Sequence, residues 1–172
     1  MSLQEWEERH RQGQDETPEP LVMSIAVSLP AGKALDLACG PGRNALWLAG
    51  HGWDVTAVDG SAAGIESLLE RAAARGFPVN AVVADLEQHQ YKIEPSAWDL
   101  IVMTRYHQRD LFEPVKQGVV PGGVVIASVL LTGRYGAKPG ELAAYFEGWE
   151  ILHQREDQRE KNLAEIAARR TR

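Results

Sequence analysis

The sequence predicts an α/β protein with a parallel sheet and helices on both of its faces. Apolar segments suited to buried strands alternate with segments whose apolar residues recur at helical spacing. Because parallel strands need crossover connections, this alternation indicates β-α-β units. The run 34–49 is typical of a strand, a glycine-rich turn and a helix. With 172 residues and 44% hydrophobic content, a single domain (1–172) is expected, with an N-terminal helical segment (1–30) and a sheet core (33–172).

Two short helices are expected before the first strand. Residues 3–12 place apolar and aromatic side chains at three- and four-residue spacing, which is typical of an amphipathic helix. Residues 21–29 form a second apolar segment that fits a helix, with an edge strand as the alternative. The first buried strand begins at Lys33 and leads into the turn. Gly40 and Gly42 lack a Cβ atom, which allows a sharp turn and a close approach of the backbone to a ligand.

Strands and helices continue to alternate after the turn. The helix that follows the second strand is expected to begin after Ser61 as N-cap and to end at Gly76. The polar run 87–97 is expected to be a connection, with a short helix as an option. The expected elements are strand 53–59, helix 62–75, strand 78–85, strand 98–103, helix 111–117, a turn at 121–123, strand 124–131, loop 132–140, helix 141–147, and a hairpin of strands 149–154 and 163–169 around the charged run 155–162.

Composition and residue counts exclude several classes of protein. The net charge of −6 argues against a nucleic-acid-binding surface. No apolar run reaches transmembrane length and the N-terminal residues are charged, so a cytoplasmic protein without a membrane partner is expected. Cys39 is the single cysteine, which excludes an internal disulfide. The histidines show no metal-ligand spacing, so no metal site is expected, and solvated positions are expected for His10, His51, His89 and His153.

Three carboxylates stand on or near the ends of the first three predicted strands: Asp36, Asp59 and Asp85. In an open parallel sheet the ligand lies beyond the carboxyl ends of the strands. Asp59 follows Gly40 at a spacing typical of a carboxylate that accepts hydrogen bonds from both hydroxyls of a ribose. Asp85 is placed to accept from an exocyclic amine such as that of adenine. The alternative for both residues is that each only caps the following helix or turn.

The glycine turn alone does not identify the cofactor. Its pattern Gly40-x-Gly42-x-x-Ala45 also fits a dinucleotide-binding turn. Asp36, four residues before the first glycine, favours a different ligand, because a carboxylate beneath the turn would repel a pyrophosphate but can meet a positively charged amino group. An amino-acid-like ligand that carries adenosine satisfies all three acids.

These residues resemble the class I S-adenosylmethionine-dependent methyltransferases. The resemblance extends over nearly the whole chain: the run 36–45 is similar to motif I, Val58-Asp59 to motif II, 84–86 to the adenine-binding motif, and 100–106 with 121–123 to the later strand motifs. A narrower similarity to the tellurite-resistance (TehB-like) branch rests on Cys-Gly-x-Gly-Arg-Asn at 39–44, the strand 53–59, Lys-Pro-Gly-Glu-Leu at 138–142, and Trp-Glu-x-Arg at 6–9.

The resemblance implies a doubly wound, Rossmann-like sheet of seven strands in the order 3-2-1-4-5-7-6, with strand 7 antiparallel. It implies S-adenosyl-L-methionine as the cofactor. Asp36 and Gly40 would then hold its methionine part, Asp59 its ribose and Asp85 with Leu86 its adenine. The loop 132–140 is shorter than the family's usual segment, which implies a reduced substrate lid. The predicted cofactor-binding residues are Asp36, Ala38, Cys39, Gly40, Arg43, Asn44, Asp59, Gly60, Ser61, Asp85, Leu86 and Thr104.

Methyl transfer from a sulfonium mainly requires an acceptor held about 3 to 3.5 Å from the methyl group, so no obligatory nucleophile is expected. The catalytic candidates are Arg105, Tyr106 and His107, directly after the predicted fourth strand. His107 could remove a proton from the acceptor, and Arg105 could bind an anionic substrate. For each of them a surface or capping role is the alternative. Arg134 and Tyr135 are weaker candidates for substrate contact, and Trp6 is a candidate cover for the cofactor.

The sequence therefore predicts an S-adenosylmethionine-dependent methyltransferase that acts on a small molecule or an inorganic oxyanion, with a homodimer considered. Two alternatives stay open. The glycine spacing permits an NAD-dependent oxidoreductase, although such an enzyme has no need for Asp36. The short loop 132–140 permits a cofactor-binding module without catalysis.

Overall fold

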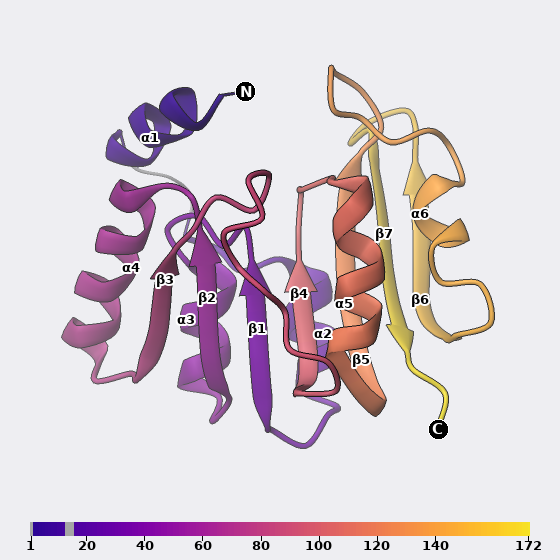
Figure 1. Ribbon diagram of the computed structural model, residues 1–172, viewed down its shortest axis with the longest axis horizontal. Helices are drawn as coiled ribbons and strands as arrows, with labels where there is room; N and C mark the ends of the chain where they lie inside the picture. The colour runs from indigo at the N-terminus through magenta and orange to yellow at the C-terminus, as the bar shows by residue number, and fades with distance from the viewer. Residues whose placement is uncertain (1, 13–15) are drawn as a thin grey trace. The chain divides into compact units, whose positions relative to one another are not determined.

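The computed structural model describes residues 2–12 and 16–172 (Figure 1). The strands of this part of the chain form a seven-stranded sheet in the order β3-β2-β1-β4-β5-β7-β6. β7 runs antiparallel to β5 and β6. The strand order and the antiparallel strand confirm the predicted Rossmann-like fold. By its internal contacts the chain divides into two compact units, Met1–Lys92 and Ile93–Arg172.

The first unit contains three parallel strands with β2 in the middle. β1 is buried at four of its five positions because its apolar residues pack beneath the helices. α3 packs against β1 and β2, and α4 packs against β2 and β3. The elements are α1 (Leu3–Arg11), α2 (Pro20–Ala26), β1 (Lys33–Leu37), α3 (Arg43–Gly50), β2 (Asp54–Asp59), α4 (Ala62–Arg75) and β3 (Val79–Val83).

Sequence signals fix the ends of α4. The Ser61 hydroxyl accepts a hydrogen bond from the Gly64 N–H, as an N-cap does. Gly76 ends the helix in the left-handed region at φ 68°. Parallel pairing places Asp36 beside Ala57 and Asp59 beside Val83. The carboxyl ends of these strands therefore bring Asp36, Asp59 and the glycine turn to the same edge.

The second unit contains one parallel pair, β4 with β5, and an antiparallel hairpin, β6 with β7, that joins it through β7. α5 packs against β4 and β5. The elements are β4 (Trp98–Met103), the 3-10 helix η1 (Arg109–Leu111), α5 (Phe112–Gly118), β5 (Val119–Leu130), α6 (Glu141–Ala144), β6 (Glu150–Asp157) and β7 (Leu163–Arg169).

Several predicted boundaries were wrong. β5 begins at Val119 rather than 124, because the register against β4 shifts between Trp98 and Leu100 and the expected turn at 121–123 lies inside the strand. The segment after Glu19 is a helix, so the edge-strand alternative falls. β3 stops before Asp85, α6 has a single turn, and β6 takes in part of the charged run 155–162. The connection 87–97 contains turns and no helix.

No helix in the described parts of the chain is long and apolar enough to cross a membrane.

Candidate functional site

The glycine turn after β1 is built from residues in the left-handed region. Ala38, Gly40 and Gly42 have φ values of 53°, 55° and 86°. A Cβ added at Gly42 would lie 2.4 Å from a methyl carbon of Leu68 on α4. Gly42 is thus required both by its backbone conformation and by the close packing of α4 on the turn. The turn then delivers the chain into α3, whose first residues are Arg43 and Asn44.

The Asp59 carboxylate fastens this turn to the end of β2. Its Oδ2 accepts from the Gly40 N–H at 2.8 Å, and its Oδ1 accepts from the Ser61 N–H at 2.8 Å. Each oxygen of an ionised carboxylate has two lone pairs, so one acceptor site per oxygen is left after these bonds. The residue caps the start of α4, as the alternative interpretation held, and keeps the capacity to accept from two hydroxyls.

Asp36 is buried on β1 and incompletely paired. The residue is 1% exposed, and its Oδ2 atom has no hydrogen-bond partner. Burial, with a smaller contribution from the charge of Asp59, raises the pKa of Asp36 to about 8. A buried oxygen of this kind is costly unless a donor reaches it. The carboxylate therefore fits a ligand with a positively charged amino group.

The first residues of α3 are held by Glu19. Arg43 Nη2 lies 2.6 Å from Glu19 Oε1, and the Glu19 N–H donates to Asn44 Oδ1 at 2.9 Å. Cys39, in the turn, is 8% exposed, and burial raises the pKa of its thiol. The thiol is therefore a packing group rather than a nucleophile.

α1 covers the turn through side chains. His10 Nδ1 lies 2.8 Å from Ser61 Oγ, and its ring lies against Gly40, where an added Cβ would be 3.2 Å from Nε2. The Glu7 carboxylate accepts from the Ala63 N–H at the start of α4. His10 is 7% exposed, so its predicted solvated position was wrong, and burial lowers the pKa of its ring. The Trp6 ring lies 5.6 Å from that of His10.

The end of β3 carries Asp85 and Leu86. Asp85 Oδ1 accepts from the Glu87 N–H at 3.0 Å and from the Gln88 N–H at 3.3 Å, so this carboxylate also caps its turn. Leu86 is buried at 5% exposure. Gly60, between β2 and α4, lies close to α1, since an added Cβ would be 2.9 Å from a methyl carbon of the exposed Leu3 side chain.

In the second unit, the residues after β4 turn sharply. Arg105 has a φ of 54°, which is uncommon for a residue with a Cβ. Its N–H donates to Ser128 Oγ at 2.8 Å, and the Tyr106 N–H donates to the Ser128 carbonyl at 3.3 Å. β5 thus holds this turn through Ser128. Thr104 is half-buried and Arg105 is exposed.

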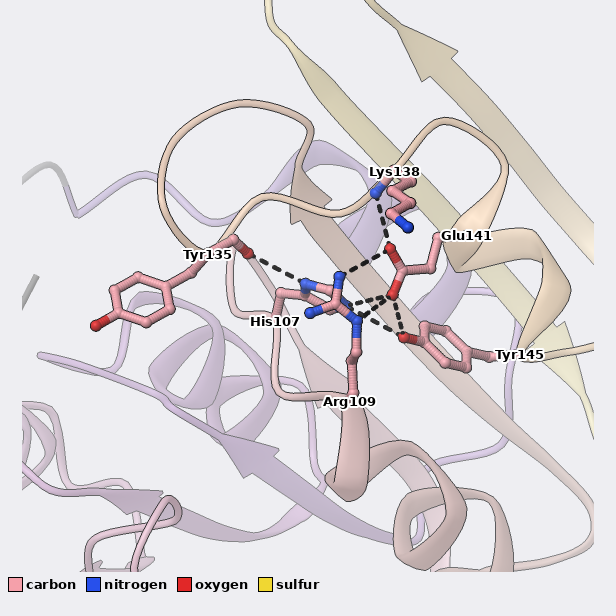
Figure 2. Close-up of polar contacts among 6 residues, drawn as sticks. All are labelled: His107, Arg109, Tyr135, Lys138, Glu141 and Tyr145. Carbon is pink, nitrogen blue, oxygen red and sulfur yellow. Dashed lines mark hydrogen bonds and ion pairs between the residues drawn. The ribbon is translucent and has the colours of Figure 1, made fainter.

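His107 belongs to a polar cluster centred on Glu141 (Figure 2). Its Nδ1 donates to the Tyr135 carbonyl at 3.1 Å, while Nε2 lies 3.2 Å from Tyr145 Oη and 3.4 Å from Glu141 Oε1. Both ring nitrogens are therefore occupied, and the side chain is 4% exposed. This geometry favours a role in holding the loops after β4 and β5 over the predicted role as a base.

Glu141 receives donors from three directions. Arg109 donates from Nε at 2.7 Å and from Nη2 at 3.2 Å, Tyr145 donates at 2.7 Å, and the Lys138 N–H donates at 2.8 Å. The hydrogen bond from Arg109, followed by those from Lys138 and Tyr145, lowers the pKa of Glu141 to about 2. Burial and the neighbouring carboxylate raise the pKa of Tyr145 to about 12. Tyr145 also stacks on Phe112 at 4.0 Å.

Sequence reasoning missed Arg109 and Tyr145 and gave Glu141 no role beyond a motif. The one signal was the Pro-Gly-Glu run at 139–141, where a glutamate opens a helix after a turn. A cavity of about 280 Å³ also lies along α3. Of the predicted cofactor-binding residues, Arg43 alone lines it. The lining residues are Glu16, Pro18, Arg43, Leu46, Trp47, Gly50, His51, Arg75 and Phe77.

Residues 34–123 match the model of a methyltransferase domain family. The chain belongs to this family. Membership favours S-adenosylmethionine, the cofactor of the class, over NAD. Within the described residues no cluster of His, Cys, Asp and Glu has the arrangement of a metal site.

Relatives of the methyltransferase domain vary in name. Hemagglutinin 1 of Eikenella corrodens is 32% identical over 133 residues, which cover 70% of this chain and 44% of the relative. A protein of Haemophilus influenzae named as probable S-adenosyl-L-methionine-dependent methyltransferase TehB is 26% identical over 149 residues, with coverage of 79% and 52%. The chain thus spans about half the length of these curated relatives.

Solved structures share the fold of this methyltransferase domain. TehB from Haemophilus influenzae superposes with a TM-score of 0.78 at 23% identity, covering 89% of this chain and 62% of that one. The magnesium protoporphyrin IX methyltransferase of Synechocystis with bound S-adenosylmethionine gives a TM-score of 0.68 at 18% identity, with coverage of 88% and 76%.

Replacing Gly42 by alanine should destabilise the methyltransferase domain more than replacing Gly76. Both glycines have positive φ, but a Cβ at Gly76 meets nothing within 4 Å. We expect a loss of about 1 kcal/mol for Gly76→Ala and about 2 to 4 kcal/mol for Gly42→Ala, measured as free energies of unfolding in urea. Equal losses would show that the contact with Leu68 relaxes without cost.

Replacing Glu141 by glutamine should loosen the loop between β5 and α6. The amide keeps one acceptor oxygen and places an NH₂ group against the donors that now face Oε2. Limited trypsin digestion reports this directly, because Arg134 lies in the loop. Cleavage after Arg134 should become at least about fivefold faster. Glu147→Gln, an exposed substitution after α6, is the matched control and should leave the rate unchanged.

The effect of Glu141 on stability should depend on pH. Its pKa is lowered from 4.5 to about 2 in the folded protein, so its stabilising contribution is complete above about pH 4.5 and is lost as the pH falls toward 2. The difference in unfolding midpoint between the natural protein and Glu141→Gln should therefore be constant near neutral pH and shrink between these two values. A difference that grows in acid would contradict this assignment.

Proposed function

We propose that the protein transfers a methyl group from S-adenosylmethionine to a small molecule or an oxyanion. The observation that carries this proposal is the buried Asp36, whose unpartnered oxygen stands beneath the glycine turn. A dinucleotide pyrophosphate offers no donor to that oxygen, whereas the ammonium group of an amino acid supplies the missing donor.

The remaining assignments follow the positions of the family's motifs. We assign the methionine part to Asp36 and Gly40, with Arg43 and Asn44 alongside, because the turn lets the backbone approach closely. The ribose hydroxyls are assigned to the two acceptor sites left on Asp59, and the adenine to Asp85 and the buried Leu86. Ala38, Cys39, Gly60, Ser61 and Thr104 complete the proposed set.

When bound, the cofactor supplies an electrophilic methyl group on a sulfonium. The protein's own contribution is to orient and to exclude water. α1, through His10 and Glu7, covers the edge of the turn and the start of α4. Because displacement at a methyl group needs chiefly a well-placed acceptor, orientation can supply most of the rate enhancement.

The acceptor is assigned to the turn after β4. Arg105 is exposed at the carboxyl end of that strand and provides a cation for an anionic acceptor. Tyr106 directly follows Arg105 in the sequence, and its hydroxyl donates to the side chain of Gln108. His107, with both ring nitrogens occupied, acts by holding the neighbouring loops. The choice of an oxyanion such as tellurite rests on the similarity to TehB alone, and a cytoplasmic location and a homodimer remain predictions.

Isothermal titration with S-adenosylmethionine, S-adenosylhomocysteine and NAD tests the proposal. We expect micromolar affinity for the first two ligands and none for NAD. Asp59→Ala should weaken both by at least about tenfold, since it removes charged acceptors. Asp54→Ala, at the opposite end of β2, is the control and should bind normally. Binding of NAD alone would replace the proposal with an oxidoreductase.

Product formation separates an enzyme from a binding module. S-adenosylhomocysteine released from S-adenosylmethionine is measured with a panel of selenite, tellurite, small thiols and small carboxylic acids. Arg105→Gln should reduce turnover of any anionic acceptor without changing the affinity for S-adenosylhomocysteine. Cofactor binding with no product from any acceptor would favour the non-catalytic module.

A further inference from the structure

We propose that binding of the cofactor's amino-acid end releases a proton from the protein, and that Asp36 is the group that gives it up. This inference rests on the proposed function and concerns the same site. Its basis is the environment of Asp36, which differs from that of the other two strand-end acids. Asp59 and Asp85 each accept hydrogen bonds from backbone N–H groups, whereas Oδ2 of Asp36 is buried without a hydrogen-bond partner.

The groups around Asp36 leave its charge without a counterion. On α3, the positive charge of Arg43 acts on Asp36, but its guanidinium lies 2.6 Å from Glu19 and is shared with that carboxylate. On β2, Asp59 is a like charge whose two oxygens accept from backbone N–H groups. The thiol of Cys39, in the turn, is held protonated by burial. The backbone N–H of Ala45 is the favourable partner on the remaining side.

In the free protein near neutral pH, Asp36 therefore carries its proton. Burial and the charge of Asp59 act in the same direction and raise its pKa to about 8. When an ammonium group arrives beneath the turn, the O–H bond of Asp36 breaks, the proton leaves to the buffer, and the carboxylate accepts an N–H from the ammonium. Charge is balanced: one neutral acid and one cation become an ion pair and a free proton.

The exchange should depend on pH. The α-amino group of a free amino acid has a higher pKa than a peptide N-terminus because its neighbouring carboxylate is ionised, so at about pH 6.5 the free ligand is charged, Asp36 is neutral, and binding releases close to one proton. At about pH 9 the free ligand is still largely charged and Asp36 is already ionised, so formation of the same ion pair releases little or no proton. The ring of His10, on α1, is influenced by the charge of Asp59, and burial lowers its pKa. If ligand binding exposed this ring to water, His10 would take up a proton near neutral pH, which is opposite in sign to the release from Asp36.

Calorimetry with S-adenosylhomocysteine in buffers of different ionisation enthalpy measures this exchange. We expect release of about one proton near pH 6.5 and little or none near pH 9. 5′-Methylthioadenosine, which lacks the amino-acid group, should bind with no exchange. Asp36→Asn should bind S-adenosylhomocysteine about tenfold more weakly and release no proton. Asp54→Asn, exposed at the amino end of β2, should behave like the natural protein.

The outcomes are distinguishable. Binding of S-adenosylhomocysteine without proton release near pH 6.5 would overturn the inference and leave the proposed function intact. Equal release with 5′-methylthioadenosine, or release that persists in Asp36→Asn, would assign the proton to another group and also overturn it. Absence of binding by either adenosyl ligand would overturn the proposed function and this inference together. The comparison of the two ligands needs no variant, so it stands even if Asp36→Asn folds poorly.

Discussion

The edge of the first unit depends on one carboxylate, that of Asp59. It joins the turn at Gly40, 19 residues earlier in the sequence, to the end of its own strand β2 and to Ser61, the N-cap of α4. Charge-assisted hydrogen bonds to backbone N–H groups are among the stronger ones in proteins. By fixing the turn against α4, Asp59 also fixes the place where Asp36 lies beneath it. The two acids are then close enough for their charges to repel each other. Asp59 accepts from two backbone N–H groups, so the repulsion adds to burial in raising the pKa of Asp36.

The two units hold their turns and loops in place by different kinds of contact. In the first, the glycine turn is shaped by packing, since α4 presses so closely on Gly42 that no side chain fits there. In the second, the loops after β4 and β5 are joined by polar contacts around Glu141, with the aromatic stack of Tyr145 on Phe112 beside them. Packing tolerates little change in volume, while a network of charged and polar groups is sensitive to protonation and to the loss of any single partner.

Local signals predicted the parallel sheet and its glycine turn: alternation of strands and helices, glycines at the turn, and acids at strand ends. The order of the seven strands followed from the resemblance to a known family, because pairing between distant strands leaves no local signal. Predicted strand boundaries were wrong where an irregular pairing decided them. At β5, the run Pro121 to Gly123 was expected to form a turn before the strand, but it lies inside the strand. His10 and the cluster of Glu141 were out of reach for another reason. His10 contacts Ser61, 51 positions away, and Glu141 contacts Arg109, 32 positions away, so the neighbouring sequence does not mark these contacts. Lys138 and Tyr145 lie close to Glu141 in the chain, but their hydrogen bonds to it also left no recognisable pattern.

α1 is attached to the first unit by side chains, through Glu7 and His10, and adds no strand to the sheet. The contacts by which α1 covers the turn are therefore separate from the strand pairing and packing that stabilise the sheet. Substitutions along α1 can change which ligands reach the edge of the sheet while leaving strand register and core packing as they are. Such a division lets the recognition of small molecules diversify without a cost in folding, and it makes α1 the natural segment to vary when altered ligand selectivity is sought.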